Sequence, residues 1–227
     1  MAWLACHQVG LHVPGGGGRG RPSRGRYDRV VAAAPRPAGW MGPASVLVPV
    51  KAFGEAKGRL APVMSPQRRA ELARRMAEAV LRSARDLPTA VVCDDRGVAG
   101  WARDRGALVV WAPGRGLNRA VQQGVAHLAA AGAELVIVAA GDLPLADDLR
   151  WVAEFPGTTL VPDRRRDGTN VLAVPTERTF GFSYGPGSFA RHLAEAERLG
   201  GPLRVVDAPR LAWDVDVPAD LLLIDRI

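Results

Sequence analysis

The chain has 227 residues, 48% of them hydrophobic, and a formal net charge of +7. This length suits one sizeable α/β domain and is short for two, and no apolar run is long enough to cross a bilayer, so we expect no membrane partner. The first residues lack the basic start of a signal peptide, and the cysteines Cys6 and Cys93 fit neither a disulfide framework nor a metal-ligand spacing. These features exclude a secreted disulfide scaffold and predict a cytoplasmic location.

The positive charge is concentrated near the start of the chain. Residues 1–43 hold six arginines and one acid, a net of +5, which leaves +2 for the remainder. Their Gly-, Pro- and Arg-rich stretch has no apolar periodicity, so it cannot bury enough surface to offset the entropy lost on ordering. We interpret residues 1–43 as a disordered extension, or as translation upstream of a true start at Met41, and expect no nucleic-acid partner. The alternative is a catalytically idle nucleotide- or RNA-binding protein that uses this Arg/Gly segment.

From Ala44 onwards, apolar strands alternate with amphipathic helices. In chain order we predict strand 45–50, a helix from Pro66 through Ala84, strand 89–93, helix 98–105, strand 108–111, helix 118–131, strand 135–139, helix 147–155, strands 159–161 and 171–174, helix 188–199, and strands near Val205 and Trp213. This alternation predicts an α/β fold with a mostly parallel sheet and helices on both faces. In such sheets the ligand lies beyond the carboxyl ends of the strands.

Acidic side chains occur where two of these strands end. Asp142 follows strand 135–139, and a carboxylate there is a common way to hold Mg²⁺ against nucleotide phosphates; a turn cap ahead of Pro144 is the alternative. Asp214 and Asp216 are two residues apart, so in a strand they project to one face, where a cation would relieve their repulsion. Asp216 could instead be the N-cap of a last helix, or serve both purposes.

Basic and glycine-rich segments complete the pattern. Lys51 and Lys57, the only lysines of the chain, follow the first strand, where they are either a phosphate grip or solvated loop charges. Glycines in the turn 185–188 expose N–H groups at a helix start, which suits an anion, although an ordinary Ser188 cap is the alternative. The turn 115–118 before another helix could contact a base or phosphate, or only cap that helix. Walker and GxGxxG motifs are absent, which disfavours the P-loop and Rossmann dinucleotide classes.

Six motifs in order resemble one family. They are PVKxxxxAKxRLAP from Pro49, GLN at 116–118, DLPL at 142–145, GTN at 168–170, GPGSFARH at 185–192 and DVDxPADL at 214–221. The chain from residue 44 to the C-terminus is therefore identified as a member of the CofC/FbiD family of guanylyltransferases in coenzyme F-420 biosynthesis. Residues 44–227 form the expected guanylyltransferase domain.

The resemblance implies a fold and a reaction. The fold is a three-layer α/β sandwich of the nucleotide-diphospho-sugar transferase (GT-A-like) type, similar to the molybdopterin guanylyltransferases. The reaction moves GMP from GTP to a phosphorylated three-carbon acid and releases pyrophosphate. We expect phosphoenolpyruvate as the acceptor, giving enolpyruvyl-2-diphospho-5'-guanosine, because the arginine-rich composition is typical of the GC-rich actinobacterial members. The alternatives are 2-phospho-L-lactate, 3-phosphoglycerate, or a molybdopterin or sugar phosphate.

The resemblance also implies the site residues. The phosphorylated acid would be held by Thr169, Gly185 and Ser188, and the Mg²⁺ cofactor by Asp142, Asp214 and Asp216. The catalytic group would be Lys51, Lys57, Arg59 and Asp142, with the basic side chains neutralising the triphosphate. The nucleotide would contact Lys51, Leu117 and Asn118. A homodimer is compatible with this class of enzyme.

Overall fold

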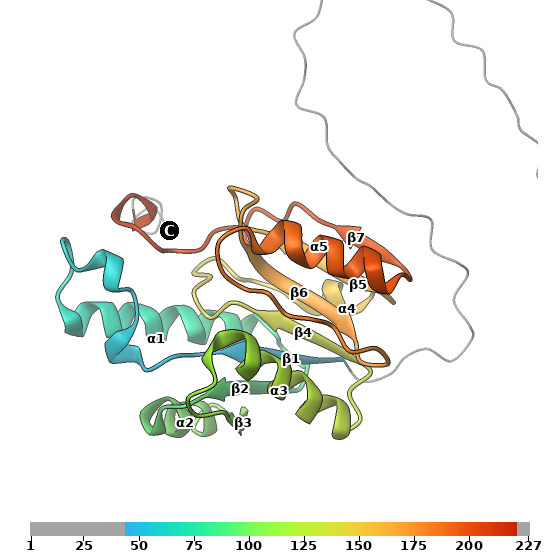
Figure 1. The fold of residues 1–227 in the computed structure, drawn as a ribbon. Coiled ribbons are helices and arrows are strands. Elements are labelled where there is room, and N and C mark those ends of the chain that lie inside the picture. The colour runs from blue at the N-terminus through green and yellow to red at the C-terminus, as the bar shows by residue number, and fades with distance from the viewer. Residues whose placement is uncertain (1–43, 222–227) are drawn as a thin grey trace, which may run out of the picture.

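The computed structural model describes residues 44–221, so the predicted extension 1–43 and residues 222–227 lie outside the described part of the chain. One sheet has the strand order β3-β2-β1-β4-β6-β5-β7 (Figure 1). The strands are β1 Ala44–Pro49, β2 Thr89–Cys93, β3 Leu108–Trp111, β4 Leu135–Ala139, β5 Thr158–Pro162, β6 Thr169–Pro175 and β7 Leu203–Val205. The helices are the short 3-10 turns η1 Phe53–Glu55 and η2 Gly58–Leu60, then α1 Pro66–Ser83, α2 Arg96–Arg103, α3 Gly116–Ala130, α4 Arg150–Ala153 and α5 Ser188–Leu199.

The sheet is mostly parallel, as predicted. Strand β1 pairs in parallel with β2 and β4, β2 with β3, and β5 with β7. Strand β6 runs antiparallel to both of its neighbours, β4 and β5. The first residue of β6, Thr169, therefore lies at the edge of the sheet where the parallel strands end, and the Ala140 N–H donates to the Asn170 carbonyl there at 2.8 Å.

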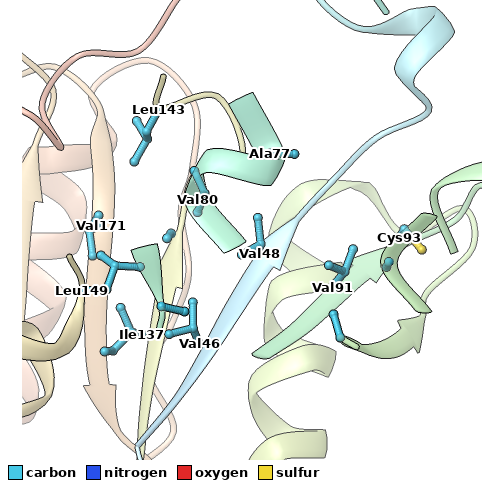
Figure 2. Packing of buried hydrophobic residues seen from close by; sticks show 14 of the residues in the cluster. Val46, Val48, Ala77, Val80, Val91, Cys93, Ile137, Leu143, Leu149 and Val171 are labelled. Atoms are coloured by element: carbon cyan, nitrogen blue, oxygen red, sulfur yellow. The ribbon is translucent and has the colours of Figure 1, made fainter. Parts of the chain in front are cut away.

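Two hydrophobic cores cover the two faces of the sheet. On one face, α1, α2 and α4 pack against strand residues such as Val46, Val48 and Ile137. Figure 2 shows Ala77 and Val80 of α1 in this core. On the other face, α3 and α5 pack against the intervening strand residues, whose side chains point to the opposite side of the sheet. The molecule is therefore the three-layer α/β sandwich that the sequence predicts.

A third, smaller core joins the ends of the described chain to α1. Leu60 of η2 and Val215 are fully buried beside Leu72 and Met76 of α1. This contact brings the segment after β1 next to residues 213–221, more than 150 residues later in the sequence. It is the reason why Lys57 can meet the C-terminal aspartates.

The predicted strand near Trp213 is wrong. Residues 213–217 have no regular secondary structure, and residues 218–221 form a 3-10 turn. The Asp220 carboxylate accepts hydrogen bonds from the backbone N–H groups of Asp216 and Val217 at 2.7 and 2.8 Å. Because these N–H groups are bonded to a side chain, they are not available to the ladder that a strand requires.

Several element boundaries also differ from the prediction, those of β6 and α4 among them. Strand β6 begins at Thr169 instead of Val171, which places Thr169 on the sheet, and α4 is limited to Arg150–Ala153. Within residues 44–221, none of the helices is both long enough and apolar enough to span a bilayer.

Candidate active site

A buried lysine lies at the centre of the charged cluster. The Lys57 Nζ donates to Asp142 Oδ2 at 2.5 Å and to Asp216 Oδ1 at 3.2 Å, and its side chain is only 9% exposed. Burial alone would lower the pKa of Lys57, but Asp142 and Asp216 together raise it above its ordinary value, so the ammonium stays charged. Its backbone is left-handed, with φ 56°, which a side chain with a Cβ rarely adopts. Such strain is typical of functional positions.

Asp214 and Asp216 lie on either side of a buried residue. Val215 is fully buried in the small core, while both neighbouring carboxylates approach Asp142. The Oδ1 of Asp214 is buried without a hydrogen-bond partner, although Arg164 Nη1 lies 3.5 Å away. Burial raises the pKa of Asp214, and the charges of Asp142 and Asp216 raise it further. The spacing of two residues therefore brings the carboxylates together, but without the strand on which the prediction relied.

Asp220 fixes the backbone that carries these two carboxylates. It is 2% exposed, and besides the two N–H groups noted above, its Oδ1 pairs with Arg164. Burial alone would raise the pKa of Asp220, but the backbone N–H groups and the guanidiniums of Arg164 and Arg165 hold it below its usual range. Sequence reasoning gave Asp220 no role, although it lies within the motif at 214–221.

An open cavity borders the charged cluster. Its volume is about 320 Å³, and Lys51, Lys57, Asp142 and Leu117 are among its lining residues. A second cavity of about 80 Å³ shares Lys51 and Leu117 and extends to Cys93 and Asp94 after β2. Both lie at the carboxyl ends of the parallel strands, where the fold class places its ligand. Lys51 and Leu117, which the sequence assigns to the nucleotide, thus line both spaces.

The glycine-rich turn at 185–188 lies beside the start of β6. The Thr169 N–H donates to Ser188 Oγ at 3.1 Å, and both residues are buried. Gly187, with φ 71°, is the N-cap of α5, and its N–H donates to Asp167 Oδ1 at 3.0 Å, so the alternative in which Ser188 caps the helix is wrong. Gly185 has φ 120°, a conformation that a side chain would strain. The structure therefore brings Thr169, Gly185 and Ser188 together at one helix N-terminus.

Asn118 connects this turn to α3. Its Oδ1 accepts the Tyr184 N–H at 2.6 Å, and its Nδ2 donates to the Tyr184 carbonyl at 3.4 Å. From the other side, Arg191 donates to the carbonyls of Ser183 and Pro186 at 2.8 and 2.7 Å. The side chain of Asn118 thus positions the loop, while contact with the nucleotide stays a prediction.

Arg59 and the predicted metal-binding carboxylates complete the charged cluster. The Arg59 side chain is 75% exposed, and its Nη1 is 3.8 Å from Asp216 Oδ2, so it lies at the rim. Within the part of the chain that the structure describes, no three His, Cys, Asp or Glu side chains are arranged as a metal-binding group. The Lys57 ammonium lies between Asp142 and Asp216 instead. The donor set nevertheless suits a hard cation, since it consists of carboxylates and includes the unpartnered Oδ1 of Asp214.

The mostly parallel α/β sandwich of this chain is also found in solved structures of nucleotidyltransferases. The fold is similar to that of a protein from Desulfovibrio desulfuricans G20 assigned to the nucleotide-diphospho-sugar transferases, with a TM-score of 0.67, 16% identity, and coverage of 81% of this chain and 86% of that one. A nucleotidyl transferase from Methanothermobacter gives a TM-score of 0.57 at 21% identity, covering 80% and 95% of the two chains. These likenesses confirm the predicted fold class.

The chain belongs to the CofC family, because the family model described as "Guanylyl transferase CofC like" matches residues 44–225. The phosphoenolpyruvate guanylyltransferase of Sphaerobacter thermophilus is 37% identical over 184 residues, which cover 77% of this chain and 89% of the relative. That of Rubrobacter xylanophilus is 37% identical over 188 residues, covering 79% and 92%. The predicted membership is confirmed, and it identifies this protein as a guanylyltransferase.

Proposed function

We propose that this protein transfers GMP from GTP to phosphoenolpyruvate, releases pyrophosphate, and serves coenzyme F-420 biosynthesis. The names of its relatives support the acceptor. The observation that carries the proposal is the juxtaposition of two sites. The Ala140–Asn170 hydrogen bond joins the end of β4, two residues before Asp142, to the start of β6 and Thr169. A charged cavity and the glycine-rich N-terminus of α5 thus meet at one edge of the sheet.

The chemistry needs positioning more than proton transfer. A phosphate oxygen of the acceptor is already anionic at neutral pH, so it can attack the α-phosphorus of GTP without a general base. The bond between that phosphorus and the bridging oxygen breaks as the new P–O bond forms, and pyrophosphate leaves with the electron pair. Lys51, Lys57 and Arg59 neutralise the negative charge that gathers on the leaving group.

Asp142, Asp214 and Asp216 are the residues that would hold a Mg²⁺ ion. Bound there, the ion would neutralise triphosphate oxygens. The unpartnered Oδ1 of Asp214 supports this assignment, and so does the mutual repulsion that raises the pKa of Asp214. Lys57 already bonds two of these carboxylates, so it can exchange them for phosphate oxygens without moving to a new part of the site.

The acid would bind at the start of α5. Thr169 and Ser188 supply hydroxyl groups, and Gly185 allows the backbone to approach the ligand closely. The positive end of the α5 dipole lies here, but the Gly187 and Phe189 N–H groups already donate to Asp167 at 3.0 Å, so the hydroxyl groups and not these N–H groups would bind the acid.

The test offers GTP and Mg²⁺ with phosphoenolpyruvate, 2-phospho-L-lactate and 3-phosphoglycerate in separate reactions. We expect pyrophosphate release and a product of the mass of enolpyruvyl-2-diphospho-5'-guanosine with phosphoenolpyruvate. Asp142→Asn should lose turnover by about 10²-fold or more, the loss expected when transition-state charge is left unneutralised. Near-normal turnover of this variant would overturn the assignment of Asp142, and release with another acid alone would overturn the acceptor.

A further inference from the structure

His192 is a fully buried ionisable residue that the proposed chemistry leaves without a role. It lies in the second turn of α5 and is 0% exposed. The rings of Phe180, Phe182 and Tyr184 surround it, with the Tyr184 centroid 4.7 Å from that of the imidazole at an interplanar angle of 73°. Burial, together with the nearby Arg191 charge, lowers the pKa of His192 to about 4, so the ring is neutral near pH 7.

Two hydrogen bonds determine which nitrogen of this ring carries the proton. The Ser183 N–H donates to His192 Nε2 at 2.9 Å, so Nε2 must be the unprotonated acceptor. In a neutral imidazole the proton then lies on Nδ1, which is 3.0 Å from Thr169 Oγ1. Nδ1–H is therefore the donor and the Thr169 hydroxyl oxygen is the acceptor.

This assignment fixes the direction of the Thr169 hydroxyl. An oxygen that accepts from Nδ1–H must direct its own hydrogen elsewhere, and within residues 44–221 that hydrogen has no protein acceptor. The Ser188 oxygen is similarly used as an acceptor, in this case by the Thr169 N–H. Both hydroxyl groups consequently have a hydrogen to donate to a ligand at the N-terminus of α5.

We propose that His192 is a positioning residue for the phosphorylated acid: its Nδ1–H holds the Thr169 hydroxyl so that this hydroxyl donates to an anionic oxygen of the substrate. The inference rests on the proposed function, since it concerns the acid half of that site. His192 itself does not touch the substrate, and it takes no proton during the reaction. Its effect should therefore fall on the acid and leave GTP binding alone.

Two variants separate the two bonds of the ring. In His192→Asn the side-chain amide can place an N–H donor near the Nδ1 position, whereas in His192→Gln it can place an acceptor near the Nε2 position. We expect His192→Gln to raise the KM for the acid by about tenfold, the cost of one lost hydrogen bond in a buried site, with the KM for GTP unchanged. His192→Asn should recover most of that loss. His127→Gln, on the exposed surface of α3, is the matched control.

Thr169→Val completes a double-mutant cycle. If His192 acts through the Thr169 hydroxyl, His192→Gln should add nothing to the KM increase that Thr169→Val already causes. Additive effects in the cycle, an unchanged acid KM in His192→Gln, or equal increases in the KM for GTP and for the acid would each overturn the proposal. The last result is what a purely structural role would give.

The ring tautomer provides a test that needs no turnover. In ¹⁵N-labelled ligand-free protein, the two-bond ¹H–¹⁵N spectrum should show His192 with a protonated Nδ1 and an unprotonated Nε2. The signal is assigned by elimination, since deleting residues 1–40 removes His7 and His12 and His127→Gln removes the other histidine. A protonated Nε2 would overturn the inference even if the variants fail to fold. If the wild-type protein releases no pyrophosphate with any of the acids, the proposed function fails, whereas the tautomer result still decides the geometry of His192 and Thr169.

Discussion

Replacing Lys57 by methionine tests the charge balance of the active site. The substitution keeps an unbranched side chain as far as its ε-carbon and removes the ammonium that bonds Asp142 at 2.5 Å and Asp216 at 3.2 Å. Breaking a fully buried pair costs about 3–5 kcal/mol, whereas exposed pairs contribute about 0–1 kcal/mol. Lys57 is 9% exposed, but the two carboxylates are 28% and 42% exposed, so solvent screening reduces the loss. We expect the free energy of unfolding to fall by about 2 kcal/mol.

Thermal unfolding followed by circular dichroism measures this loss. For a domain of this size, about 2 kcal/mol corresponds to a decrease in Tm of about 4–8 °C in buffer with a chelator. Added Mg²⁺ should then raise the Tm of Lys57→Met more than that of the wild type, because the variant leaves Asp142 and Asp216 without their cation. Arg59→Met is the control, with an expected change within about 0.5 kcal/mol because that side chain is 75% exposed. If both variants lose the same stability, or if Mg²⁺ stabilises the wild type equally, the carboxylates are not the shared partners of lysine and metal.

Four further outcomes follow from the structure. Lys51→Arg should lower turnover by about tenfold or more at an unchanged Tm. Lys51 is exposed, and the substitution only replaces its compact ammonium by a wider, planar guanidinium of the same charge. Asp214→Asn should abolish most turnover, yet the urea midpoint at neutral pH should stay unchanged or move to a higher concentration. The reason is that the pKa of Asp214 is raised in the folded protein, so its charged form costs folding free energy. This cost grows as the pH rises from the ordinary pKa of an aspartate towards the raised pKa of Asp214. Gly157→Ala should lower the free energy of unfolding by about 2 kcal/mol or more, because its Cβ would lie 2.1 Å from the Pro202 carbonyl oxygen. Deleting residues 1–40 should leave the rate of pyrophosphate release unchanged, and a loss of activity would show that the extension belongs to the enzyme.

The periodicity of the sequence predicted most of the fold because the buried strands and amphipathic helices leave strong local signals. It did not identify β6 as the antiparallel strand, although the link from β5 to β6, residues 163–168, is too short for a parallel crossover. The error at Trp213 has a different cause. An alternation of apolar and acidic residues resembles a strand, but here it packs Val215 into a small core against α1 while Asp220 takes the backbone N–H groups.

The charged side chains of the site could be predicted from the sequence, whereas the residues that hydrogen-bond to them and hold them in place could not. Asp142 at a strand end and the paired spacing of Asp214 and Asp216 are visible in short windows of sequence. Lys57 and Asp216, which are hydrogen-bonded, are 159 residues apart in the sequence, and the bond between Asn118 and Tyr184 joins residues 66 apart. No local pattern encodes such pairings, since they depend on how the helices and loops pack. His192 illustrates the same limit, because only its two bonds reveal which nitrogen faces Thr169.

The two lysines of this arginine-rich chain are lysines, and not arginines, for different physical reasons. Lys57 is a buried point charge between two carboxylates, on a left-handed backbone three residues before the buried Leu60. A guanidinium is wider and carries five donors, so burying it there would require more acceptors than Asp142 and Asp216 present. Arg59, two residues further on, tolerates arginine because its head is exposed. Lys51 is also exposed, so burial does not explain why it is a lysine. A requirement for an ammonium at that position would have to come from a ligand in the cavity, so we expect its replacement by arginine to affect turnover without affecting stability.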